Sequence, residues 1–159
     1  MRVIEHVRSL DPPWAFLAVL KPGQDAQAVL AGPAGFVARV ADGRRCRTKP
    51  ELLAELPRVL GCPADAAPNW DALEECLADL EWLPAAGYII GVSHAEELLS
   101  ESPDDYDVFL SIIEEVGKEW SSPRGGEWPR PAAPFHVGLT VLEGRQSAHR
   151  DWRVPTLEP

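Results

Sequence analysis

The most regular pattern of apolar and polar positions in the chain lies between residues 69 and 80. Apolar side chains recur there every three or four positions: Trp70, Leu73, Leu77 and Leu80. At about 100° per residue, this spacing predicts a helix with one apolar face. Acidic side chains recur every four positions on the opposite face: Asp71, Glu75 and Asp79. Asn69 is a favourable N-cap, because its side-chain oxygen accepts a hydrogen bond from an N–H group at the start of a helix.

These acidic positions have no basic residue within the predicted helix to compensate them. Carboxylates four residues apart repel one another and slightly weaken a helix. Asp79, close to the C-terminal end, is also unfavourable to the helix dipole. A charged outer face is ordinary for a solvated helix. The pattern alone therefore leaves two interpretations open, a solvated surface or a surface that binds a basic partner.

Strand-length apolar runs and helical patterns alternate along the rest of the chain. Strands are predicted over residues 14–20, 35–41, 87–92 and 135–142. Helical patterns occupy residues 24–31, 48–60, 93–99 and 102–120. Pro57 predicts a kink or an early end in the second of these helices. Strands separated by helices indicate an α/β fold, with a small, mainly parallel sheet and helices packed on its faces.

Charge is distributed unevenly along the 159 residues. The chain has 25 acidic against 15 basic residues, a formal net charge of −10. No Lys or Arg occurs from Val59 to Gly117, a stretch that holds fourteen of the acidic residues. Such a surface attracts a basic protein and repels nucleic acid and anionic membranes. This distribution favours the interpretation of the acidic helix as a binding surface.

Cysteine content and the N-terminus indicate a cytoplasmic protein. The three cysteines, Cys46, Cys62 and Cys76, are an odd number and have no metal-binding spacing. We interpret them as reduced thiols that are buried or inert. The N-terminal residues contain no unbroken apolar segment, so no signal peptide is expected. The longest apolar runs are far too short to span a bilayer.

Residues with catalytic potential do not form a recognisable catalytic set. Ser93 and His94 are adjacent, but the capping-box spacing from Ser93 to Glu96 makes Ser93 the expected start of a short helix. The four histidines lack zinc-ligand spacing, and the glycines form no phosphate-binding motif. Asp71 and Glu75 could together hold a metal or act as an acid–base pair, but no basic group accompanies them on the helix. We therefore predict that the protein is not an enzyme and that it binds no metal and no cofactor.

A loop rich in Pro and Gly separates the last predicted helix from the last predicted strand. Trp128 lies in it between Arg124 and Arg130, an arrangement that can stack on nucleic-acid bases. Two arginines against the negative charge of the whole chain favour a structural loop instead.

The segment from Asn69 to Leu77 resembles the N-x-D-A-L-x-D/E-C-L signature of the barstar family, intracellular inhibitors of barnase-type ribonucleases. The resemblance extends over about residues 36–142, where the predicted elements follow the family order and supply its three strands. We expect a barstar-like domain over residues 36–142. Residues 1–35 are expected to form an N-terminal extension with an extra strand and a short helix, after a loose lead-in at residues 1–13. Residues 143–159 are expected to be a flexible tail.

The resemblance implies a function and a set of partner-binding residues. In the family, acidic side chains of this helix enter the cationic active site of the nuclease and replace substrate phosphates. By position, Asp71 and Glu75 correspond to the first and second of these acids, and Glu115 falls near a third on a later helix. Asn69 matches the family asparagine at the binding loop. We expect three further acids, Glu74, Asp79 and Glu115, to support Asp71 and Glu75 in binding the partner.

Two departures from the family pattern leave an alternative open. The family prototype has an aromatic pair and a glycine ahead of its asparagine, whereas residues 65–68 here contain neither. Glu74 also stands where the prototype has an interface tryptophan. Aromatic anchors often dominate interface energetics. The sequence therefore predicts an inhibitor of a basic toxin, most simply a small ribonuclease, with a non-inhibitory protein-interaction module as the alternative.

Overall fold

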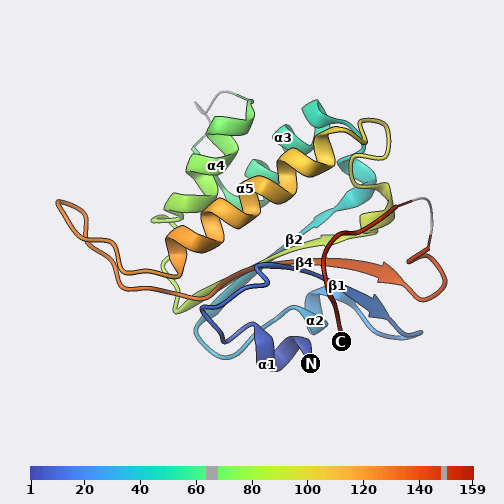
Figure 1. The fold of residues 1–159 in the computed structure, drawn as a ribbon, viewed down its shortest axis with the longest axis horizontal. Coiled ribbons are helices and arrows are strands. Elements are labelled where there is room, and N and C mark those ends of the chain that lie inside the picture. Colours follow the sequence, from blue (N-terminus) through green and yellow to red (C-terminus); the bar gives the residue numbers. More distant parts are fainter. Residues whose placement is uncertain (64–67, 148–149) are drawn as a thin grey trace.

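A five-stranded parallel sheet forms the centre of the molecule (Figure 1). The computed structural model describes residues 1–63, 68–147 and 150–159. The strand order is β2-β3-β4-β1-β5, and every pairing between these strands is parallel. The strands are β1 (Ala15–Leu20), β2 (Phe36–Asp42), β3 (Gly87–Ser93), β4 (Phe135–Leu142) and β5 (Thr156–Leu157). The predicted α/β fold is confirmed, including the extra N-terminal strand, which lies between β4 and β5.

Helices cover both faces of this sheet (Figure 1). One face carries the three long helices: α3 (Lys49–Leu60), α4 (Trp70–Asp79) and α5 (Asp105–Trp120). Their apolar faces and the facing strand residues form the larger buried cluster. The other face carries α1 (Val3–His6) and α2 (Ala26–Val29), which cover a smaller cluster that includes Phe16 and Ile89. Two 3₁₀ helices, η1 (Gly43–Arg45) and η2 (Ala95–Glu97), follow β2 and β3.

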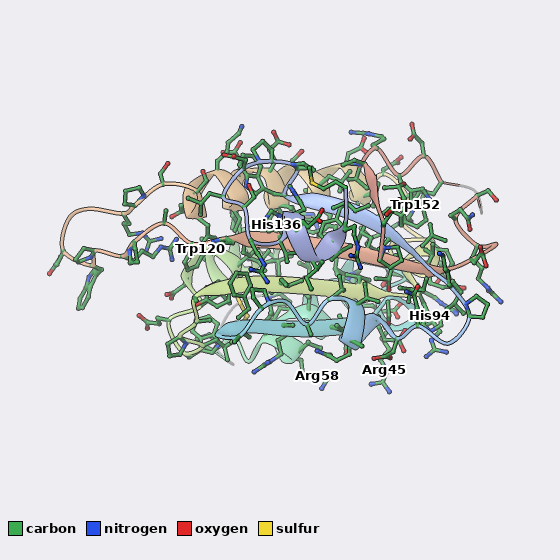
Figure 2. All side chains as sticks on the ribbon, turned by 90° about the horizontal axis from the view of Figure 1, so that it is seen from below. Arg45, Arg58, His94, Trp120, His136 and Trp152 are labelled. Atoms are coloured by element: carbon green, nitrogen blue, oxygen red, sulfur yellow. A yellow bond between two sulfur atoms is a disulfide. The ribbon has the colours of Figure 1, made fainter. Side chains whose placement is uncertain are left out.

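Residues 1–13 pack against the sheet, so the expectation of a loose lead-in is wrong. Val3, His6 and Val7 are buried, and the imidazole of His6 lies 4.7 Å, centroid to centroid, from that of His136 on β4. Figure 2 labels His136 beside α1. This segment is too short, and has too few apolar residues, to show a helical period. Their burial depends on the neighbouring sheet.

Trp14 fixes the extension to the opposite face of the sheet as well. Its indole packs on Gly117 of α5, where an added Cβ would lie 2.2 Å from Trp14 Cγ. Its Nε1 donates a hydrogen bond to the Leu10 carbonyl oxygen at 3.2 Å. Glycine at position 117 thus permits α5 to approach the start of β1 closely.

The C-terminal residues also differ from the expected flexible tail. Leu157 is buried, and β5 pairs with β1. Trp152 is buried, and its carbonyl oxygen accepts a hydrogen bond from the hydroxyl of Tyr106 at 2.8 Å. Isolated apolar residues in a polar segment give no periodic signal, so this docking was not visible in the sequence. The domain boundaries after residues 35 and 142 stay a prediction, since residues on both sides of them pack on one sheet.

Two local predictions need correction. α3 is continuous through Pro57, because strong signals hold both of its ends: Thr48 Oγ1 accepts from Glu51 N–H, and Gly61 adopts the left-handed conformation at φ 70°. The short helix expected over residues 93–99 is reduced to η2. Ser93 ends β3 and donates its hydroxyl to the Ala41 carbonyl oxygen at 3.3 Å, so it does not act as a helix cap.

Candidate functional site

α4 forms as the sequence pattern predicts. Asn69 Oδ1 accepts a hydrogen bond from the N–H of Ala72 at 2.8 Å and caps the first turn. Three underside residues are buried against the core: Leu73, Cys76 and Leu77. The helix ends at Asp79, and Leu80 follows in the left-handed conformation with φ 51°. Burial of this underside orients the opposite side of α4 toward solvent.

Asp71, Glu75 and Asp79 form what we call the acidic face of α4, and all three side chains are exposed. Glu74 lies beside them and is half-buried. Within the described residues, the salt bridges of the protein involve other carboxylates than these four. The acidic face therefore presents its charge to solvent, and no Lys or Arg among the described residues forms an ion pair with it.

The C-terminal end of α4 is held by two arginines that sequence reasoning assigned to a structural loop. Arg130 Nη1 donates to the carbonyl oxygens of Ala78 at 2.6 Å and Asp79 at 3.3 Å. Arg124 Nη2 donates to the Ala78 oxygen at 3.4 Å and to Glu119 Oε1 at 2.8 Å. Positive groups at this end of a helix satisfy unpaired carbonyls and oppose the negative end of the dipole. These contacts offset the unfavourable position of Asp79.

Arg130 is in turn held by α5. Its guanidinium lies 3.4 Å from the centroid of the Trp120 ring, and Trp120 Nε1 donates to the Leu77 carbonyl oxygen at 2.9 Å. Burial lowers the pKa of Arg130 from its ordinary high value, which leaves the side chain cationic at neutral pH. The ends of α4 and α5 are therefore joined by a polar network.

A hollow of about 360 Å³ opens between α4 and the end of α5. It is lined by Glu74, Glu75, Ala78, Asp79, Glu119 and Arg124. Three predicted site residues are thus brought together, with a fourth carboxylate that the sequence analysis missed. Glu119 follows Glu115 by one helical turn on the exposed side of α5, and this spacing was the available signal.

Asp71 and Glu115 occupy different positions from that group. Asp71 does not line the hollow and lies at the N-terminal end of α4. Glu115 is exposed on α5 and lies 3.6 Å from Lys118 Nζ, an i,i+3 ion pair. Such a surface pair contributes little to stability. The prediction that these residues bind a partner remains a prediction.

The cysteines correct another expectation. Cys62, after α3, and Cys76, on α4, form a disulfide with a Cα–Cα distance of 6.0 Å. Cys46 is free and buried, and burial raises the pKa of its thiol to about 12. A separation of fourteen residues gives no hint of pairing until α3 and α4 fold against each other.

The loop at residues 65–67, whose lack of aromatic residues separates this chain from the family prototype, lies outside the described residues.

A family model described as "Barstar (barnase inhibitor)" matches residues 36–139. The chain belongs to the barstar family. The match runs from the start of β2 into β4 and includes α3, α4 and α5, so it contains the whole acidic face. It leaves out β1, β5 and the two short helices on the other side of the sheet. A search among curated proteins finds no match to the chain.

Among the described residues, none of the helices is both long and apolar enough to cross a membrane. No group of three or more His, Cys, Asp or Glu side chains in the same residues is arranged to hold a metal ion.

Proposed function

We propose that this barstar-family protein inhibits a basic toxin, most simply a small barnase-type ribonuclease, and so acts as an immunity protein. The acidic face of α4 would enter the nuclease active site and take the place of RNA phosphates. The observation that supports this most strongly is the exposure of Asp71, Glu75 and Asp79 on one side of a helix that is capped and buried underneath.

Electrostatics favours such a complex on two counts. A ribonuclease site that binds RNA phosphates presents cationic groups, and unpaired carboxylates offer them complementary charge. The acidic middle of the chain also raises the rate of encounter with a basic partner. Because screening acts over about 8 Å at physiological ionic strength, the association rate is expected to fall as salt is added.

The half-buried Glu74 and the sequence of the loop before Asn69 favour a second candidate. With fewer aromatic anchors there, the same acidic surface can serve as a non-inhibitory module that holds another basic protein. Inhibition of RNA cleavage separates the two candidates, because only the first requires that the nuclease active site be blocked.

The experiment adds the purified protein to a barnase-type ribonuclease and follows RNA cleavage. We expect cleavage to stop at stoichiometric protein, and the double variant Asp71→Ala/Glu75→Ala to inhibit at least about thirtyfold less well, since truncating one side of a close charge pair costs about 2 kcal/mol or more. The matched control is Glu5→Ala/Glu158→Ala, which removes two exposed carboxylates on the other side of the molecule. Undiminished cleavage at micromolar protein would refute the inhibitor proposal for that nuclease.

A cytoplasmic location belongs to the same proposal, because an immunity protein acts where the RNA of its own cell is at risk. Disulfides are rare in the cytosol, so the Cys62–Cys76 bond makes the location testable. Alkylation of free thiols in fresh cell extract should trap both cysteines reduced if the protein is cytoplasmic. Fully oxidised protein at that stage would contradict this location.

A further inference from the structure

Residues 121–134, which we call the finger, project beyond the end of α5 and away from the sheet (Figure 1, orange). Two backbone hydrogen bonds between Arg124 and Arg130, of 2.9 and 3.1 Å, close the finger at its base. Trp128 lies beyond this closure, and 77% of its surface is exposed. The indole therefore remains in water while the base of the finger is ordered.

The base of the finger is attached directly to the proposed binding helix. The side chains of Arg124 and Arg130 reach the last carbonyl groups of α4, as described above, and Arg130 stacks on Trp120. Figure 2 labels Trp120 next to the point where the projecting segment leaves the body. Through these contacts the position of the finger relative to Asp79 is set before any partner arrives.

A groove of about 370 Å³ runs between the finger and the body of the protein. Its lining includes Trp128 and Pro129 from the finger and Asp79 and Tyr88 from the body. Asp79 and Arg124 also line the acidic hollow. The groove and the hollow are therefore adjoining parts of one surface, with carboxylates at one end and an exposed indole at the other.

We propose that Trp128 is the aromatic anchor of this interface, inserted into the same basic protein that receives the acidic face; the proposal rests on the function proposed above. Tryptophan is enriched among the residues that dominate interface energetics. A finger that is already ordered loses less conformational entropy on binding than a mobile loop. An indole face also attracts Arg and Lys side chains, which a nuclease active-site rim supplies. The finger thus provides an aromatic contact that residues 65–68 lack in sequence.

The test measures binding to a catalytically inactive barnase-type ribonuclease by surface plasmon resonance. Trp128→Ala should raise Kd at least about thirtyfold, the effect of truncating a hot-spot residue by about 2 kcal/mol. The loss should come mainly from faster dissociation, because removal of a neutral side chain leaves electrostatic steering unchanged. Trp128→Phe keeps an aromatic face and should retain most of the affinity. Ile4→Ala, at a half-exposed apolar residue on α1, is the control and should bind like the wild type.

The outcomes separate this proposal from the one on which it rests. If the wild type binds and Trp128→Ala binds within about twofold of it, the anchor is refuted while the inhibitor function stands. If the wild type fails to bind the ribonuclease at micromolar concentration, the proposed function is refuted and the anchor with it. Because Trp128 is largely exposed, unfolding of the variant is not expected, and circular dichroism of Trp128→Ala checks this.

Discussion

Acid is expected to destabilise the protein through one buried side chain, His136 on β4. Its Nε2 donates to the Ser9 carbonyl oxygen at 2.8 Å, and its ring lies against that of His6. Burial of this fully enclosed imidazole lowers its pKa from 6.5 to about 4. The unfolded chain therefore binds a proton near pH 6.5, whereas the folded chain does so only near pH 4.

The size of the effect follows from this difference in pKa. Above pH 6.5 both states hold a neutral imidazole, so His136 gives no pH dependence there. Between pH 6.5 and 4 the unfolded state binds more protons, and stability is lost as the pH falls. Each pKa unit corresponds to about 1.36 kcal/mol, so the loss amounts to about 3 kcal/mol on reaching pH 4. Against a total stability of about 5–15 kcal/mol for a domain, this fraction is measurable.

Urea unfolding at several pH values between about 4 and 7.5 measures this loss. Carboxylates also titrate near the lower end, so the comparison is made with His136→Gln, which keeps a hydrogen-bond donor but does not titrate. The variant should lose about 3 kcal/mol less than the wild type over this range. An identical pH dependence of the unfolding free energy in the two proteins would refute the reasoning.

Three further predictions concern stability. Cys62→Ala/Cys76→Ala should lower the unfolding free energy by about 3 kcal/mol, because the disulfide closes a fourteen-residue loop in the unfolded chain. As a control, the variant and the wild type should have the same urea midpoint once dithiothreitol has reduced the wild type. Asn69→Ala should cost about 1 kcal/mol by removing the cap of α4, and an unchanged thermal midpoint would argue against that cap. Gly117→Ala should lower stability by about 1–3 kcal/mol despite the better helix propensity of alanine, because its Cβ would overlap the Trp14 ring; a higher melting temperature would contradict this packing.

The parts of the fold that follow from the sequence are those in which local signals agree. α4 was predicted because the Asn69 cap and the apolar spacing both indicate a helix that begins at residue 70. The sheet was predicted because apolar runs of strand length alternate with helical patterns. Where signals conflicted, as at Pro57, the stronger end caps prevailed and α3 stayed continuous.

The parts that escaped prediction depend on contacts between distant segments. The pairing of β5 with β1, the burial of Trp152 and the Cys62–Cys76 disulfide each depend on contacts between segments that no local pattern pairs in the sequence. The binding surface shows the same division. The spacing of its carboxylates along the sequence predicted that they share one face of a helix. The contacts of Arg124 and Arg130 with the end of α4 could not be predicted, because only the fold brings these two arginines within hydrogen-bond distance of its carbonyl groups.

Competition with an RNA-like ligand tests the central claim most directly, namely that the acidic face of α4 replaces phosphates in a nuclease active site. The measurement is the apparent Kd for an inactive barnase-type ribonuclease as a non-cleavable oligonucleotide is added. We predict that this Kd rises in proportion to the oligonucleotide concentration, because both ligands need the same cationic site. An apparent Kd that stays constant while the oligonucleotide saturates the nuclease would contradict the account.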